Sequence, residues 1–207
     1  ATNVASLSVV ADHTAKFNAF ADSTSAALLG ASGALASNTI DSKVNVAMGA
    51  NSNISAKNID LQANNRILKD WIAGRYNATS GSGGALDLPA VASITNISNT
   101  ANINVAAGAS LKVVANTGGA TGKLSLSTLN DVTARDRTKL DSGGAISVAR
   151  SESRINNTVN RGQIVIGDAD LTSAGDIDLA TLTNVDIDAQ ANAKTYGLAG
   201  AAQGVSV

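Results

Sequence analysis

The densest group of residues that could do chemistry is a set of aspartates near the C-terminal end of the sequence. Two Asp-Ile-Asp triplets begin at Asp176 and Asp186, so acidic residues occupy alternate positions there. In a β-strand, alternate side chains point to the same side, and each triplet would present two carboxylates on one outward face. Calcium accepts carboxylate oxygens as ligands. The candidate calcium ligands are therefore Asp176, Asp178, Asp186 and Asp188.

The same aspartates have a second interpretation, as members of salt bridges. The corresponding positions of earlier repeats hold Asn58 and Asp60, or Lys123 and Ser125, and the glycine-rich nonapeptide that binds calcium in other repeat proteins is absent. We expect salt bridges or solvation to be the main role of the acids, with calcium as the alternative and no other cofactor. Aromatic residues do not alternate with the neighbouring basic residues, so nucleic acid is not an expected partner. These plausible basic partners are Arg135, Arg137, Lys139, Arg150, Arg154 and Arg161.

No catalytic residue is expected. His13 is the only histidine, and a lone histidine cannot form a multi-histidine metal site. A Ser-His-Asp arrangement would have to be built around it, yet no Gly-x-Ser-x-Gly nucleophile motif is present. We expect His13 to be a solvated turn residue. A polysaccharide-acting enzyme that uses two carboxylates is an alternative, but no pair of acids stands out, and a surface poor in aromatic residues is a poor platform for sugars.

The composition indicates short strands and tight turns. Aromatic residues make up 2% of the 207 residues, whereas hydrophobic residues make up 44%, mostly Ala, Val, Ile and Leu. A globular core usually relies on aromatic side chains for buried area. The 19 glycines, with many Asn, Ser, Thr and Asp, indicate frequent turns. We expect a thin, regular core filled by small and branched side chains.

Neither the net charge nor the cysteine content indicates a binding partner. The net charge is −1 and charged residues make up 15%, so no overall field draws the chain to nucleic acid or to an anionic membrane. The absence of cysteine excludes disulfides and thiolate metal sites. The sequence has neither a run long enough to insert into a membrane nor a signal peptide, so a secretion signal would lie outside it.

Three segments, residues 33–61, 84–126 and 144–179, repeat one order of strand and turn residues. Residues 1–32 resemble the end of a preceding copy and residues 200–207 the start of another, so we expect an excerpt of a longer protein or a subunit that docks to complete its repeat. The copies are 1–32, 33–83, 84–143, 144–199 and 200–207. One series of apolar doublets is Val44/Val46, Ile103/Val105 and Ile164/Ile166, and a looser series is Ile59/Leu61, Leu124/Leu126 and Ile177/Leu179.

Each doublet encloses one polar or variable residue, which is the periodicity of a β-strand. Parallel coiling explains the constant order better than an antiparallel sandwich does, because each strand then stacks on its equivalent. We expect about three rungs of roughly 20 residues in each repeat. Ile103 and Val105 are predicted to face the core and Asn104 to face away from it. Residues 65–76 are expected to form a rung carried on a loop, with a short helix on the flank of the solenoid as the alternative.

Five segments carry a resemblance to a known family: residues 142–148 (SGGAISV), 155–159 (INNTV), 164–168 (IVIGD), 171–177 (LTSAGDI) and 196–200 (YGLAG). They resemble the repeats of giant bacterial exoproteins, the filamentous-haemagglutinin-like and leukotoxin-type filamentous adhesins. The resemblance implies a right-handed parallel β-helix, display on the cell surface, and an adhesive or structural role. It implies no catalytic residues.

The sequence thus predicts an all-β fold, a right-handed parallel β-helix (β-solenoid) of about three imperfect repeats, continuous over residues 1–207. The expected function is a shaft or stalk module of a bacterial cell-surface adhesin or extracellular filament. The expected partners are neighbouring repeats or subunits, end to end, with a host-cell or surface receptor as a further candidate. A self-assembling filament subunit and a polysaccharide-acting β-helix enzyme are the alternatives.

Overall fold

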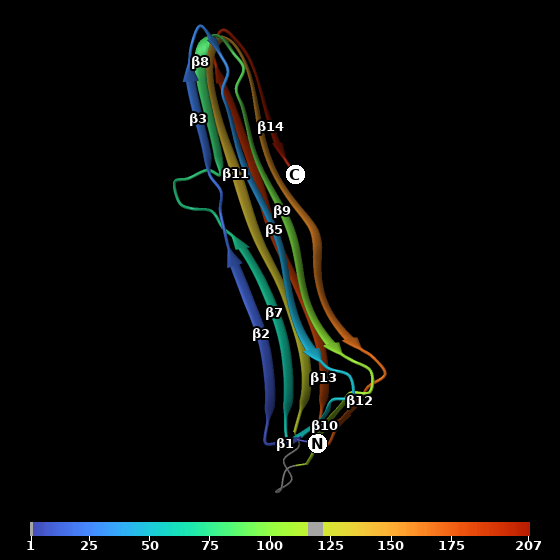
Figure 1. Ribbon diagram of the computed structural model, residues 1–207. Helices are drawn as coiled ribbons and strands as arrows, with labels where there is room; N and C mark the ends of the chain where they lie inside the picture. The colour runs from blue at the N-terminus through green and yellow to red at the C-terminus, as the bar shows by residue number, and fades with distance from the viewer. Residues whose placement is uncertain (1, 116–121) are drawn as a thin grey trace.

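The computed structural model describes residues 2–115 and 122–207, and their regular structure is entirely β (Figure 1). Within these ranges, no helix has the length and apolar character needed to cross a membrane. The first seven strands are β1 (Thr2–Val4), β2 (Leu7–Lys16), β3 (Ala21–Ala26), β4 (Leu29–Gly30), β5 (Gly33–Met48), β6 (Asn53–Ala56) and β7 (Ile59–Lys69). The others are β8 (Ala78–Asp87), β9 (Ala90–Val105), β10 (Ser110–Val113), β11 (Leu124–Ile166), β12 (Asp170–Ser173), β13 (Ile177–Tyr196) and β14 (Ala199–Ser206).

The chain runs repeatedly through the same three regions: a short base strand, a long outgoing arm and a long return arm. We call one such circuit a pass. Successive outgoing arms are formed by β2 and β3, by β7 and β8, by the first half of β11, and by β13. Successive return arms are formed by β5, by β9, by the second half of β11, and by β14. A short base strand, β1, β6, β10 or β12, precedes each outgoing arm. Figure 1 shows the two arms lying side by side, joined by a turn at one end, with the base strands at the other.

Neighbouring passes pair in parallel in all three places. The base strands form a sheet in the order β1-β6-β10-β12, and each pair in it is parallel. The expected parallel all-β arrangement is therefore confirmed. The looser series of doublets also predicted the correct register of the outgoing arms. One column of that register holds Leu7, Ile59, Leu124 and Ile177.

The other series of doublets is correct in two repeats and wrong in one. Ile103 pairs with Ile164, as predicted. In the first repeat, however, Val46 pairs with Ile103, and Val44 pairs with Ala101. The predicted alignment of that repeat is therefore two residues out of register. An apolar doublet alone cannot exclude such a shift, because alternate residues of a strand share one face.

Each repeat is one pass with two long arms, so the prediction of three short rungs per repeat is wrong. The strand β13 has 20 residues, and β11 runs for 43 residues through both arms. The polar residues inside these arms look like turn residues in the sequence, but they are inward-facing strand residues with partners in the opposite arm. The helical alternative for residues 65–76 is also wrong, because residues 65–69 belong to β7 and residues 70–77 form a loop.

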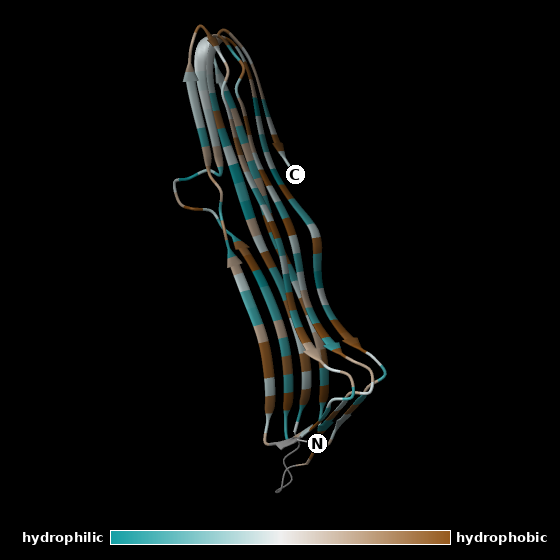
Figure 2. Cartoon of the chain, viewed as in Figure 1, coloured by the Kyte–Doolittle hydropathy of each residue, from teal (hydrophilic) through white to brown (hydrophobic). Residues whose placement is uncertain are grey.

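Alternate side chains of the arms form a thin interior between them. In β7, every second residue from Ile59 to Lys69 is buried, and Figure 2 shows bands of hydrophobic and hydrophilic residues along the strands. The predicted facing of the second repeat is confirmed, because Ile103 and Val105 are fully buried and Asn104 is exposed. The largest apolar cluster lies near the base strands, and two smaller clusters lie further along the arms.

The apolar doublet also faces the interior in the first repeat, but the difference in exposure between the doublet and its enclosed residue is smaller in the third. Val44 and Val46 are buried around the exposed Asn45. Ile166, in contrast, is 37% exposed, close to the 42% of its neighbour Val165. The difference follows from position, because no further strand covers this part of β11 in the described structure.

Candidate functional site

The first predicted acidic pair lies at the start of β13 beside a lysine. Asp178 forms an ion pair with the Nζ atom of Lys123, and both side chains are about half exposed. The hydrogen bond and the charge of Asp178 raise the pKa of Lys123, and the charge of Asp176 adds a smaller effect in the same direction. This pair of acids therefore faces a basic residue in the preceding pass.

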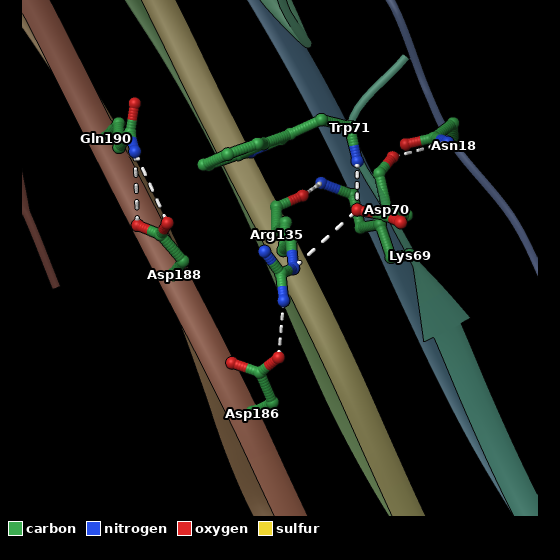
Figure 3. Close-up of polar contacts among 8 residues, drawn as sticks. All are labelled: Asn18, Lys69, Asp70, Trp71, Arg135, Asp186, Asp188 and Gln190. Atoms are coloured by element: carbon green, nitrogen blue, oxygen red, sulfur yellow. Dashed lines mark hydrogen bonds and ion pairs between the residues drawn. The ribbon is translucent and has the colours of Figure 1, made fainter. Parts of the chain in front are cut away.

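The second acidic pair is separated from the first along the same strand. The carboxylate of Asp186 accepts a hydrogen bond of 2.5 Å from Nη2 of Arg135, which confirms the predicted salt bridge for this residue. Asp188 accepts a hydrogen bond of 3.3 Å from Nε2 of Gln190 (Figure 3). Across residues 2–115 and 122–207, no group of three or more His, Cys, Asp or Glu side chains is arranged to hold a metal ion.

His13 lies in β2, so its prediction as a turn residue is wrong. The side chain is exposed, because β2 is the edge strand of the outgoing arms. Its Nδ1 atom lies 3.1 Å from Oδ1 of Asn65 and 3.1 Å from Oγ of Ser42. His13 therefore ends a row of polar side chains that continues into the interior.

This row consists mainly of asparagines that connect the two arms. Asn65 donates a hydrogen bond of 2.9 Å to the carbonyl of Thr100, and Asn130 donates one of 2.9 Å to the carbonyl of Asn99. Ser42 donates a 2.8 Å hydrogen bond to Oδ1 of Asn65. Because these amides donate hydrogen bonds to the backbone of the opposite arm, their polar groups can be buried in the thin interior between the two arms.

A fully buried ion pair lies further along the interior. The Nζ atom of Lys69 is 3.0 Å from Oδ2 of Asp136, and both side chains have no exposed area. Lys69 also donates to the carbonyl of Arg135 at 3.2 Å, and the hydroxyl of Thr95 donates to Asp136 at 3.0 Å. Burial lowers the pKa of Lys69, and the charge and hydrogen bond of Asp136 oppose this effect.

A second buried carboxylate lies at the turn between the arms. Asp87 has no exposed area and accepts hydrogen bonds from the hydroxyls of Ser82 and Ser142. The hydroxyl of Ser142 also contacts that of Ser147 in the return arm. The interior of the turn is thus held by polar contacts as well as by small residues.

Residues 70–77, which we call the aromatic loop, leave the outgoing arm between β7 and β8. Two arginines of β11 pack against its rings. The guanidinium of Arg137 lies 5.6 Å from the ring centre of Trp71 and 4.8 Å from that of Tyr76, and Arg135 lies 5.5 Å from Trp71. Arg75 of the loop lies 3.9 Å from the ring centre of Phe20, which lies between β2 and β3. Cation–π contacts therefore fix the rings of the loop against the sheet.

Figure 3 shows how Arg135 fixes the start of the aromatic loop. Its guanidinium lies beneath the ring of Trp71, 3.6 Å from the carboxylate of Asp70 and 2.5 Å from that of Asp186. The amide of Trp71 donates to Asp70 at 2.8 Å, and Asn18 donates to the carbonyl of Asp70 at 3.2 Å. One arginine thus connects three passes of the chain.

Two hollows lie on the outer face of the outgoing arms, one on each side of Tyr76. The larger, of about 390 Å³, opens over β3 and β8, and the smaller, of about 150 Å³, opens over β11 and β13. Their floor is formed by two neighbouring columns of residues. One column contributes Thr24, Gly81, Asp141 and Lys194, and the other contributes Thr79, Lys139 and Asn192.

No family model, curated protein or solved structure matches this chain. The arrangement around Tyr76 must therefore be interpreted from its own chemistry.

Sequence reasoning did not find this site. The sequence contains a signal for it, because four of the five aromatic residues, Phe17, Phe20, Trp71 and Tyr76, occur where the outgoing arm is interrupted in the first two passes. The polar columns are harder to find, because their members are spread over four passes of the chain.

Proposed function

We propose that the chain is a section of a right-handed parallel β-helix that serves as the shaft of a bacterial cell-surface adhesin or extracellular filament. The observation that supports this most is the repeated passage of the chain through the same sheets in parallel register. Solenoid proteins extend by stacking equivalent elements in this way. The likeness of the repeats to those of filamentous adhesins supports an extracellular location and an adhesive role.

The outer edge formed by β13 supports stacking against a further pass. Leu179 and Val185 are 51% and 50% exposed, whereas Leu126 and Val132, their partners in the covered pass, have no exposed area. A further pass would bury these side chains and would pair the outer backbone groups of β13. Neighbouring repeats or other subunits, end to end, are therefore the proposed partners.

The arms determine the shape of such a shaft. At about 3.3 Å per residue, the 20 residues of β13 span roughly 66 Å. Each added pass extends the stack by only about 4.8 Å. The proposed shaft is thus a flat ribbon that is wide along the strands and gains length through many thin passes.

Duplicating one pass tests the proposal. Ile177 follows Asp176 and is the register partner of Leu124, so a second copy of residues 124–176 inserted after Asp176 re-enters the same register. We expect the longer chain to unfold cooperatively and to grow by about 4.8 Å in one dimension in X-ray scattering. A variant with the inserted residues in scrambled order is the control. If the duplicated residues behave as a disordered loop, as the scrambled ones should, the proposal is wrong.

A self-assembling filament subunit is the alternative that the same open edge favours. Negative-stain images of the purified chain over a range of concentrations distinguish the two functions. Thin particles of constant size support a shaft section, whereas long fibres formed by this chain alone support an assembling subunit.

A further inference from the structure

We propose that the surface around Tyr76 binds a short acidic oligosaccharide, with the sugar ring on Tyr76 and a uronate carboxylate on Lys194. This site would lie on the side of the proposed shaft, and it does not depend on the shaft function. The shape of the two hollows, the polar groups on their floor and the fixed loop beside them support this site.

The hollows have the shape of a groove that crosses the strands. Both hollows are lined by Tyr76, Lys139 and Asp141, so they adjoin at these three side chains, and we call the two together the groove. Together, the two hollows reach from β3 to β13 over four adjacent outgoing strands. With strands about 4.8 Å apart, it extends over roughly 14 Å, which suits a short, extended oligosaccharide.

The floor of the groove offers the groups that sugars use. Thr79 and Asn192 can exchange hydrogen bonds with hydroxyl groups, and Gly81 lowers the floor because it carries no side chain. Tyr76 supplies an aromatic ring with a polar tip. The groove has no second aromatic ring in its lining on which nucleic-acid bases could stack.

The charges of the groove favour a carboxylate on the ligand. The Nζ atom of Lys139 is paired with Asp141 at 2.6 Å, and the hydroxyl of Thr79 is bonded to Asp22. Lys194 lies beside Asp141 in the next pass, yet none of the ion pairs among the described residues includes it. A carboxylate at this edge of the groove would form a charge-assisted hydrogen bond with Lys194.

The aromatic loop is already held in a fixed position beside the groove. Arg137 donates hydrogen bonds of 2.8 Å to the carbonyls of Ile72 and Arg75, and its guanidinium lies 4.8 Å from the ring centre of Tyr76. A ligand would therefore lose little binding energy to ordering of the loop.

Titration of the full chain with trigalacturonate tests the proposal. Trp71 is the only tryptophan and shares Arg137 with Tyr76, so its fluorescence reports on the site. We expect a saturable change in emission. We expect about tenfold weaker binding of the same oligosaccharide after its carboxyl groups are reduced, because the charge-assisted hydrogen bond is then lost.

Two variants and one control locate the binding. Tyr76→Ala should weaken binding of both oligosaccharides by about tenfold, and Lys194→Gln should remove the preference for the acidic one. Lys194 is exposed, so its variant should fold even if the loop variant does not. Lys112→Gln, at an exposed position of β10, is the matched control and should bind like the parent. Three results would each overturn the proposal: no saturable binding, an unchanged preference in Lys194→Gln, or equal binding of triglutamate, a polyanion without sugar rings.

Discussion

Replacing Lys69 and Asp136 separately and together measures what the buried ion pair does for stability. At 3.0 Å and an effective dielectric constant of about 20, the attraction between the two charges is about 5.5 kcal/mol. Removing each ion from water costs several kcal/mol, so the two effects nearly cancel. The compensation is incomplete on one side, because Oδ1 of Asp136 is buried without a hydrogen-bond partner in the described structure.

From this balance we expect the two single variants to be much less stable than the double variant. Lys69→Met leaves a buried carboxylate unpaired, and Asp136→Asn leaves a buried ammonium unpaired, each at about 3–5 kcal/mol. Together they should return the free energy of unfolding to within about 1 kcal/mol of the parent. Urea denaturation with a constant slope is the assay. Single variants that each cost less than about 1 kcal/mol would refute the buried pair.

The lowered pKa of Lys69 gives the same pair a pH signature. Between the folded pKa and the ordinary lysine pKa, the unfolded chain binds more protons than the folded chain does, so the free energy of unfolding rises with pH. The penalty of burying the ammonium is present below the folded pKa and is relieved as the pH rises. As the pH rises towards the ordinary pKa of lysine, the parent should therefore gain stability relative to Lys69→Met. If the free energies of unfolding of the parent and of Lys69→Met change with pH in the same way, this prediction is wrong.

Three further predictions concern the interior and the surface acids. Ile103→Lys and Val105→Lys should each cost several kcal/mol in circular dichroism melts, because they bury an unpaired ammonium, whereas Asn104→Lys should cost less than about 1 kcal/mol; a melt of Asn104→Lys like those of its neighbours would contradict the assigned register. Melts with excess calcium and with chelator should coincide, since Asp178 and Asp186 are held by basic partners; a stabilisation of several kcal/mol would make them ligands. Incubation with acidic and neutral polysaccharides should release no sugar; release that is lost on replacing one Asp or Glu would support the enzyme alternative.

The parallel stacking could be predicted because strand periodicity and repeat spacing can both be read directly from the order of residues. The column of Leu7, Ile59, Leu124 and Ile177 illustrates this, since each residue opens a strand at a recurrent position. The length of the arms was not predictable in the same way. Residues such as Asn65 and Asn99 favour turns when considered alone, and only the opposite arm, which accepts their hydrogen bonds, makes them suitable for a strand interior.

The candidate site was less predictable than the fold. Its floor combines residues from four passes, such as Thr24, Gly81, Asp141 and Lys194, which are neighbours only once the register is known. A one-residue error in the register of any pass would turn these side chains inward and dissolve the groove. The aspartates near the start of β13 are close in sequence, and two of them, Asp178 and Asp186, pair with basic residues of the preceding pass.

Polar layers inside the arms explain how a thin core of similar apolar residues adopts a single register. Apolar doublets tolerate a shift of two residues, since the shifted doublet still faces inward. The asparagine layer does not: Asn99 lies opposite Asn65 and Asn130, and the same shift would place its amide against Ile67 and Val132. Each buried amide left without a partner would cost about 1–3 kcal/mol, and the loss would occur both in the pass of Asn65 and Asn99 and in the pass of Asn130.

The first repeat illustrates this selection of register. An alignment on apolar doublets places Val44 beside Ile103, but the structure places Ser42 beside Asn99, where its hydroxyl bonds to Asn65. That hydrogen bond exists only in the observed register. The apolar residues therefore make the arms pack, and the polar layers determine which residues meet, including those that form the groove beside Tyr76.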